Sequence, residues 1–121
     1  MARRYLIVDD NTAFLDAAVS LLTRQGLEVV GVASTIEEAL TRARELNPDV
    51  VLVDIMLGEE SGFDLAQRLA GDEGTSRASV ILISTQDESD FAELINEAPA
   101  LGFVSKSELS AATIERLVDS A

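Results

Sequence analysis

The chain has 121 residues, enough for a single domain, 1–121, and too few for two. Hydrophobic residues make up 47%, and the absence of cysteine and histidine excludes disulfides, thiolate or imidazole zinc sites and histidine-dependent triads. The net charge of −13 opposes direct binding to nucleic acid. Because no apolar run reaches the length of a membrane span or a signal-peptide core, we expect a cytoplasmic protein that binds no membrane.

Apolar runs alternate with amphipathic stretches from the N-terminus onward. Tyr5–Val8 predicts a strand, and apolar residues at helical spacing after Asn11 predict a helix that Gly26 ends. Leu27–Ala33 predicts the second strand. Ser34 or Thr35 is then expected to cap a second helix, and Ser34 to Glu37 has the spacing of a capping box.

The second half of the chain repeats this alternation three times. Val50–Val53 is a continuous apolar run, which suits a strand buried on both faces of a parallel sheet, and Gly58–Ser61 is predicted as a loop. Ser79–Ser84 and Leu101–Ser105 predict the last two strands, each followed by a helix. Five βα units predict an α/β fold: a doubly wound, five-stranded parallel sheet with helices on both faces, flavodoxin-like (βα)5.

Polar residues stand directly after the predicted strands, and in such folds ligands bind beyond the carboxyl ends of the strands. Asp9 and Asp10 follow the first strand, Asp54 the third, Ser84 the fourth and Lys106 the fifth. Taken singly, an aspartate at a strand end is usually a turn former or a helix cap. Three carboxylates together, however, repel one another unless a cation intervenes, and oxygen ligands suit Mg2+. With a lysine and a hydroxyl, the set is suited to stabilising an anion such as a phosphoryl group.

Over nearly its whole length the chain resembles the receiver domains of two-component response regulators. Five short motifs match that family in order and spacing: the Asp9–Asp10 pair, V-L-V-D at 51–54, S-G-F-D-L at 61–65, I-L-I-S at 81–84 and G-F-V-S-K at 102–106. Any one of these motifs is weak evidence, whereas five in register over about a hundred residues are specific. The K-S-E-L segment at 106–109 resembles the subgroup of receivers that often precedes a helix-turn-helix domain.

The resemblance implies a role for each of these residues. Asp54 would accept a phosphoryl group from a sensor histidine kinase, a histidine phosphotransfer protein or a small acyl phosphate. Ser84 and Lys106 would bind phosphoryl oxygens, and Phe103 would be a switch residue that repacks with Ser84. The face formed by residues 87–121 would be the regulated surface and the surface of a homodimer. Four groups are implied as ligands of Mg2+: Asp10, Asp54, the backbone carbonyl of Met56, and Asp9 either directly or through water.

Three positions depart from the family pattern. Ser107 stands where a proline usually follows the lysine, Thr85 stands where alanine or glycine is usual, and Leu57–Gly58 lacks the proline often found there. Because a non-proline cis peptide costs about 2.5–4 kcal/mol, we expect the Lys106–Ser107 bond to be trans. Phe103 has an alternative interpretation as an ordinary core residue.

Three other functions compete with this interpretation. A phosphohydrolase of the haloacid dehalogenase type needs Asp-x-Asp after the first strand, whereas Asp9 and Asp10 are adjacent. A flavin-binding domain needs a phosphate loop rich in hydroxyls and glycine there, and two carboxylates would repel the phosphate. A pseudo-receiver would not need Asp54, Ser84 and Lys106. The residues therefore favour a signalling phosphoacceptor that catalyses its own phosphorylation and dephosphorylation and is not a turnover enzyme.

Overall fold

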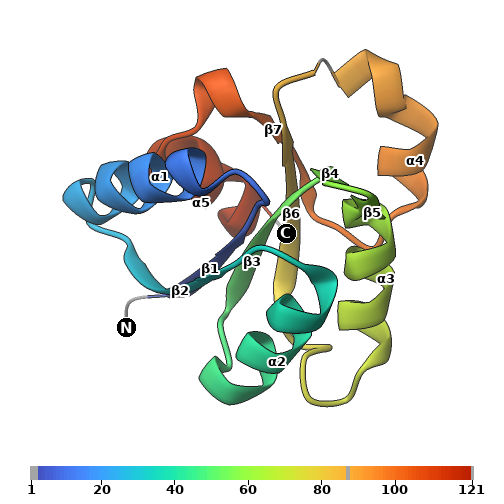
Figure 1. Cartoon of the computed structure of the whole chain (residues 1–121). Helices are drawn as coiled ribbons and strands as arrows, with labels where there is room; N and C mark the ends of the chain where they lie inside the picture. The colour runs from blue at the N-terminus through green and yellow to red at the C-terminus, as the bar shows by residue number, and fades with distance from the viewer. Residues whose placement is uncertain (1–2, 87, 121) are drawn as a thin grey trace.

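A computed structural model describes residues 3–86 and 88–120 of the chain (Figure 1). Its main sheet has five parallel strands in the order β2-β1-β3-β6-β7, as expected for a doubly wound fold. The strands are β1 (Arg4–Val8), β2 (Glu28–Ala33), β3 (Val50–Asp54), β6 (Ser79–Ser84) and β7 (Gly102–Ser105).

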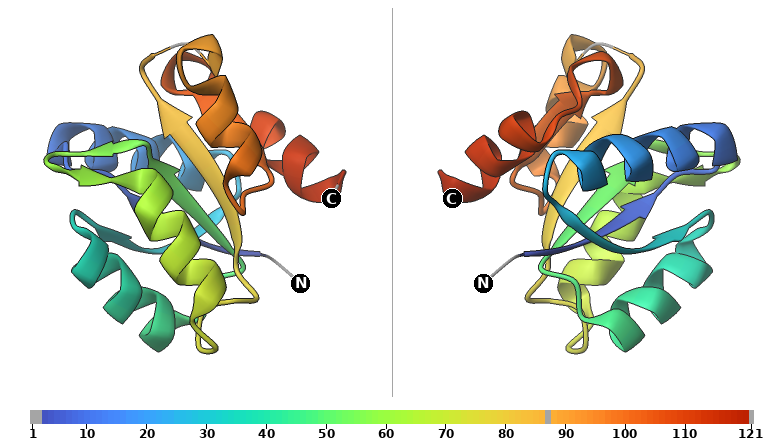
Figure 2. Two further views of the ribbon diagram at one scale, coloured as in Figure 1. Left: turned by 90° about the vertical axis from the view of Figure 1, so that its right-hand side faces the viewer. Right: turned by 90° about the vertical axis from the view of Figure 1, so that its left-hand side faces the viewer.

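Four α-helices connect these strands, a fifth follows β7, and together they cover both faces of the sheet. Figure 2 shows α1 and α5 on one face and α2, α3 and α4 on the other. No helix of the described part of the chain is both long and apolar enough to cross a membrane. The helices are α1 (Thr12–Arg24), α2 (Ile36–Leu46), α3 (Gly62–Gly71), α4 (Ala92–Glu97) and α5 (Ala111–Asp119), with 3-10 turns η1 (Glu88–Phe91) and η2 (Lys106–Glu108).

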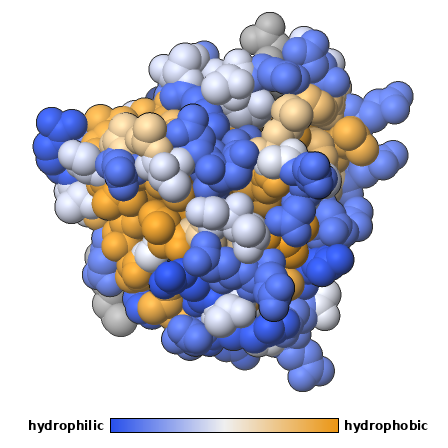
Figure 3. All heavy atoms as spheres, viewed as in Figure 1, coloured by the Kyte–Doolittle hydropathy of each residue, from blue (hydrophilic) through white to orange (hydrophobic). Residues whose placement is uncertain are grey.

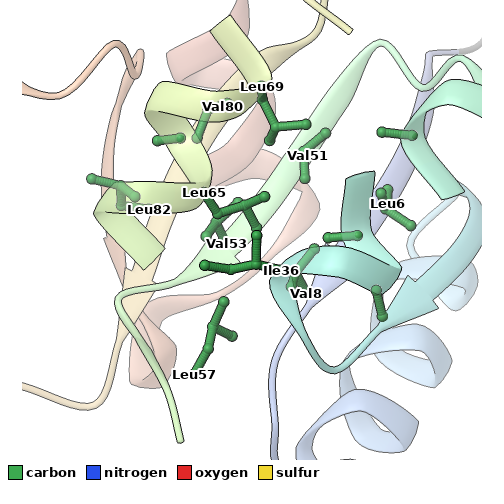
Figure 4. Packing of buried hydrophobic residues seen from close by; sticks show 14 of the residues in the cluster. Leu6, Val8, Ile36, Val51, Val53, Leu57, Leu65, Leu69, Val80 and Leu82 are labelled. Atoms are coloured by element: carbon green, nitrogen blue, oxygen red, sulfur yellow. The ribbon is translucent and has the colours of Figure 1, made fainter. Parts of the chain in front are cut away.

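The central strand β3 is buried on both faces, as its continuous apolar run predicts. Val51 and Val53 point into the core under α2 and α3, where Figure 4 shows them beside Leu65. Val50 and Leu52 point into the opposite core under α1 and α5. Because successive side chains of a strand alternate between faces, only a strand apolar at every position can serve both cores.

Polar residues cover most of one face of the molecule (Figure 3). The face shown in Figure 3 is largely hydrophilic, in keeping with the net charge of −13, and its apolar side chains gather in patches beside α1 and α4. Two large apolar side chains, Met56 and Leu94, are about half exposed.

At the start of α2 the structure selects one of the two predicted caps and shifts the predicted capping box. The N-cap is Thr35, whose hydroxyl accepts the Glu38 N–H at 3.1 Å, and the Glu38 carboxylate accepts the Ser34 N–H at 2.7 Å. The predicted spacing from Ser34 to Glu37 is therefore one residue too early. Thr35 and Glu38 satisfy the same free amides from the next position along the chain.

The segment predicted as a loop after β3 contains a small hairpin. Two short strands, β4 (Met56–Leu57) and β5 (Glu60–Ser61), pair antiparallel, and Gly58 turns between them with φ of +64°. A positive φ at this position favours glycine, because other residues meet steric resistance there. Sequence periodicity does not detect strands of two residues.

The Lys106–Ser107 peptide is trans, as expected, since the described residues contain no cis peptide bond. The last helix begins later than its apolar pattern predicts. Leu109 follows the turn η2, and Ser110 caps α5 by accepting the Thr113 N–H at 3.1 Å. Four residues of the predicted domain and regulated surface lie outside the described residues: Met1, Ala2, Asp87 and Ala121.

Gly62 is where α3 meets the end of β3, and it leaves no room for a side chain. A Cβ there would lie 2.8 Å from the Asp54 carbonyl carbon and 2.9 Å from Ile55 Cα. We therefore expect Gly62→Ala to lower the free energy of unfolding by about 1–3 kcal/mol or more. Gly71→Ala, at the other end of α3, meets no atom within 4 Å and should raise it by about 0.5–1 kcal/mol. Urea denaturation of both variants measures this contrast, and equal effects would contradict it.

Candidate functional site

The carboxyl ends of four parallel strands meet at one edge of the sheet, and the polar residues there come together. Asp9 follows β1, Asp54 ends β3, Ser84 ends β6 and Lys106 follows β7. Asp9 and Asp54 are buried, with 0% and 6% of their surfaces exposed, whereas Asp10 is exposed. One oxygen from each of these three carboxylates lies within 4.8 Å of the others.

The loop between β1 and α1 fixes Asp9 and the first turn of α1 through two hydrogen bonds. Asp9 Oδ1 accepts the backbone N–H of Asn11 at 2.9 Å. Asn11 Oδ1 in turn accepts the Phe14 N–H at 3.1 Å and caps the helix. Of the two residues before the helix that could cap it, Asp10 and Asn11, the structure uses Asn11, and this cap therefore also sets the position of a buried carboxylate.

Asp54 has a different partner for each carboxylate oxygen. Oδ1 accepts the Met56 N–H at 3.1 Å, and Oδ2 accepts a hydrogen bond from Lys106 Nζ at 3.1 Å. The pKa of Asp54 is raised to about 6, mainly by burial and also by the nearby Asp9 carboxylate. The Met56 N–H and the Lys106 ammonium oppose this shift, so the value reflects burial that its partners only partly offset.

Lys106, the only lysine of the chain, is the one cation that contacts both buried carboxylates among the described residues. Its Nζ lies 2.5 Å from Asp9 Oδ2, and its side chain is only 12% exposed. Burial acts to lower the Lys106 pKa, but contacts with Asp9 and Asp54 outweigh it and raise the pKa overall. The ammonium also lies 4.1 Å from the centroid of the Phe14 ring.

The acidic cluster fits a hard divalent cation. Asp9 Oδ2 is buried and has no hydrogen-bond partner of acceptable geometry, although it forms the ion pair with Lys106. A buried oxygen in this state gains from coordination, and carboxylate oxygens are the ligands that Mg2+ prefers. Asp10 lies beside the hairpin turn, with Oδ2 3.7 Å from where a Gly58 Cβ would stand, which is an ordinary contact distance.

The remaining predicted site residues lie around this cluster. Ser84 is buried, and its Oγ accepts the Gln86 N–H at 3.0 Å, while Thr85 is exposed. The Met56 side chain is exposed and contacts Gln86 Nε2 through its sulfur at 3.8 Å. Phe103 on β7 is half-buried and packs against the core under α2 and α3.

Sequence reasoning missed two contributors to the site. Phe14 is assigned from its helical spacing to the core of the first helix, and its contact with the ammonium is not visible in that spacing. Gly62 belongs to a recognised motif, but its tight approach to the Asp54 backbone depends on the path of α3. Its place in the S-G-F-D-L motif at 61–65 is the signal in the sequence.

The raised pKa of Asp54 predicts how metal-free stability depends on pH. Folding raises this pKa from about 3.9 in the unfolded chain, so the folded protein binds more protons between pH 4 and 6 and loses stability as pH rises through that window. Asp54→Asn, which stays neutral, should therefore raise the free energy of unfolding at pH 7 by about 1–3 kcal/mol and by much less at pH 4. Denaturation in a chelator, with exposed Asp16→Asn as the control, tests this; an equal gain at both pH values would contradict it.

Comparisons with known proteins agree with this geometry. The model of the response regulator receiver domain family matches residues 5–118. The chain is 33% identical over 104 residues to the response regulator GacA of Pseudomonas viridiflava, covering 85% of this chain and 48% of the relative. The chain thus spans about half the length of the response regulators of this type that it matches.

Two further proteins are similar over most of their lengths. The polar-differentiation response regulator DivK of Brucella ovis is 31% identical over 106 residues, which cover 88% of this chain and 85% of the relative. A crystal structure of the signal receiver domain of a modulated diguanylate cyclase from Desulfovibrio desulfuricans G20 superposes with a TM-score of 0.82 at 30% identity, covering 100% of this chain and 94% of that one. The chain belongs to the response regulator receiver domain family, whose members are phosphoacceptors of two-component signalling.

Proposed function

We propose that Asp54 is the residue of this receiver domain that accepts the phosphoryl group. The observation that carries the proposal is the pair of contacts on its carboxylate: the Met56 N–H on Oδ1 and the Lys106 ammonium on Oδ2. These contacts orient the group at the sheet edge beside two further carboxylates. Asp9 is held in a similar way by Asn11 and Lys106, but none of its surface is exposed to a phosphodonor, whereas 6% of the Asp54 surface is exposed.

Asp54 acts as a carboxylate nucleophile. One carboxylate oxygen forms a bond to phosphorus while the phosphorus–nitrogen bond of a partner's phosphohistidine, or the phosphorus–oxygen bond of an acyl phosphate, breaks. The leaving imidazole or carboxylate takes the bonding electron pair and exchanges protons with solvent. With a pKa near 6, Asp54 is mostly ionised at neutral pH and is ready to react.

Lys106 and Ser84 bind the transferred group from two sides. The Lys106 ammonium already lies at Asp54 Oδ2 and supplies positive charge where the phosphoryl oxygens bring negative charge. The Ser84 oxygen accepts the Gln86 N–H, so its hydroxyl proton can be donated to a phosphoryl oxygen.

Asp9, Asp10, Asp54 and the Met56 carbonyl would hold the Mg2+ ion. The three carboxylates lie within reach of one cation, and the buried Asp9 oxygen without a hydrogen-bond partner supports this assignment. When bound, the ion neutralises carboxylate charge and polarises phosphoryl oxygens. The protein's part is to hold these oxygens together against their mutual repulsion.

Membership of the family implies a histidine kinase or histidine phosphotransfer partner in general. We further propose that this chain binds no nucleic acid, on the basis of its net charge of −13, and that it acts in the cytoplasm, in keeping with its lack of cysteine. It catalyses its own phosphorylation and dephosphorylation and does not turn over a separate substrate.

We propose the face of residues 87–121 as the regulated surface and the surface of self-association. Ser84 and Phe103 lie on the neighbouring strands β6 and β7, with Ser84 paired to Ser105 in register. If Ser84 turns toward a phosphoryl oxygen, Phe103 can change its half-buried packing beside α4 and alter this face. Phosphorylation shifts the balance between the two conformations of this face only as far as the phosphoryl group interacts more favourably with one of them.

The first test of function is phosphorylation by acetyl phosphate with Mg2+, followed by intact mass. The wild-type domain and exposed-site control Asp16→Ala should each gain one phosphoryl group, whereas Asp54→Ala should gain none. A phosphoryl group on Asp54→Ala would place the acceptor elsewhere.

The same assay tests the metal ligands. Asp10→Ala should keep the fold but weaken Mg2+ affinity by roughly 10–100-fold, because it removes one of three clustered carboxylates. Phosphorylation of this variant should then need correspondingly more Mg2+. Unchanged Mg2+ affinity would show that Asp10 is not a ligand.

The output mechanism predicts a specific effect of Ser84→Ala. This variant should still be phosphorylated, at a lower rate, because Asp54 and Lys106 remain. Amide chemical-shift mapping with and without beryllofluoride should show wild-type changes that extend to Phe103 and α4, and these changes should be weaker in Ser84→Ala. Wild-type changes confined to the Asp9, Asp10 and Asp54 loops would contradict the surface switch.

A further inference from the structure

We propose that Phe14 is a positioning residue for Lys106, whose ammonium it holds at the acceptor site through the face of its ring. Lys106 Nζ lies 4.1 Å from the ring centroid, well within the range of a cation–π contact. The proposal rests on the proposed function, because Lys106 acts on the phosphoryl group only if Asp54 accepts it.

The ring and the buried carboxylate reach Lys106 from the same loop and helix turn. Asn11 links them, since its N–H donates to Asp9 Oδ1 at 2.9 Å and its side chain accepts the Phe14 N–H at 3.1 Å. Phe14 is half-buried and packs against the core under α1 and α5. The aromatic face is therefore held in a fixed position relative to Asp9.

Both anionic partners of Lys106 have another role in the proposed reaction. Asp9 is a ligand of the proposed cation, and Asp54 becomes esterified when it accepts a phosphoryl group. Phe14 has neither role. The ring is thus the one partner of the ammonium, among the contacts described for it, that is neither a ligand of the cation nor the acceptor.

The contact is placed where it has a measurable effect. The Lys106 side chain is only 12% exposed, and a cation–π contact strengthens as the cation loses water. A lysine side chain has a flexible four-carbon stem with many rotamers. An additional contact therefore helps to keep the ammonium beside Asp54. Loss of such a contact corresponds to a factor of about 2–30 in rate.

The kinetic test uses acetyl phosphate at saturating Mg2+. Phe14→Leu, which removes the ring face and keeps an apolar side chain, should slow phosphorylation by about 2–30-fold, and Phe14→Tyr should restore most of the lost rate. Val19→Ala, which trims a half-buried residue of the same helix and core, should leave the rate unchanged. In a Lys106→Met background, Phe14→Leu should have no further effect, because the residue through which it acts is absent.

Two kinetic results would overturn the proposal. One is a Phe14→Leu rate equal to wild type. The other is an equal slowing by Phe14→Leu with and without Lys106, because the effect would then come from packing alone.

A spectroscopic measurement tests the contact without any phosphorylation. Because Lys106 is the only lysine, protein with isotopically labelled lysine gives one side-chain spin system in an NMR spectrum. The ring should move its ε-methylene protons upfield of their position in the unfolded chain, and Phe14→Leu should abolish this shift while Phe14→Tyr keeps it. An unshifted signal in the folded wild-type domain overturns the proposal even if Phe14→Leu does not fold. A shifted signal in a wild-type domain that accepts no phosphoryl group would confirm the contact and contradict the proposed function instead.

Discussion

The structure depends on the burial of two like charges balanced by one opposite charge. Asp9 and Asp54 are nearly inaccessible to solvent, and Lys106 Nζ contacts both, at 2.5 and 3.1 Å. Buried carboxylates repel each other and lose their hydration, so this arrangement is unfavourable without compensation. One ammonium compensates only in part, as the raised pKa of Asp54 indicates. Repulsion between the two carboxylates therefore remains in the metal-free site, and binding of a further positive charge would reduce it.

The parallel sheet stabilises the fold enough to hold these charged groups together. The strand order β2-β1-β3-β6-β7 brings the ends of β1, β3 and β7 near one another, although Asp9 and Lys106 are almost a hundred residues apart in sequence. The two apolar cores on either side of β3 hold these strand ends rigidly. The polar groups at the sheet edge are therefore held in place by the two apolar cores, although they contribute little to those cores.

Short-range capping supplies the finer positioning. A hydrogen bond from the backbone N–H of Asn11 orients Asp9, and one from the backbone N–H of Met56 orients Asp54. Each buried carboxylate is therefore fixed by the second residue after it. Gly62 then allows α3 to start against the Asp54 backbone, with its N–H donating to the Ile55 carbonyl at 2.7 Å. The same loops thus orient the carboxylates and direct the chain into its helices.

The sequence by itself determined which strand each polar site residue follows and the burial of Val50–Val53 on both faces of the sheet. It also determined that four charged residues gather at one edge: Asp9, Asp10, Asp54 and Lys106. It did so because apolar periodicity is a local property and parallel strands carry their ends to a common edge. The family motifs added the roles of Ser84 and Phe103, which remain proposals.

Only the tertiary structure decided which partners each charged atom meets. The Asp54 carboxylate divides its oxygens between Met56 and Lys106, and the Phe14 ring lies beside the ammonium and not wholly within the core. The hairpin after β3 and the choice of Thr35 over Ser34 as the cap of α2 also appear only in three dimensions. Each depends on ångström-scale distances between segments far apart in the chain, and residue spacing within a segment carries no information about those distances.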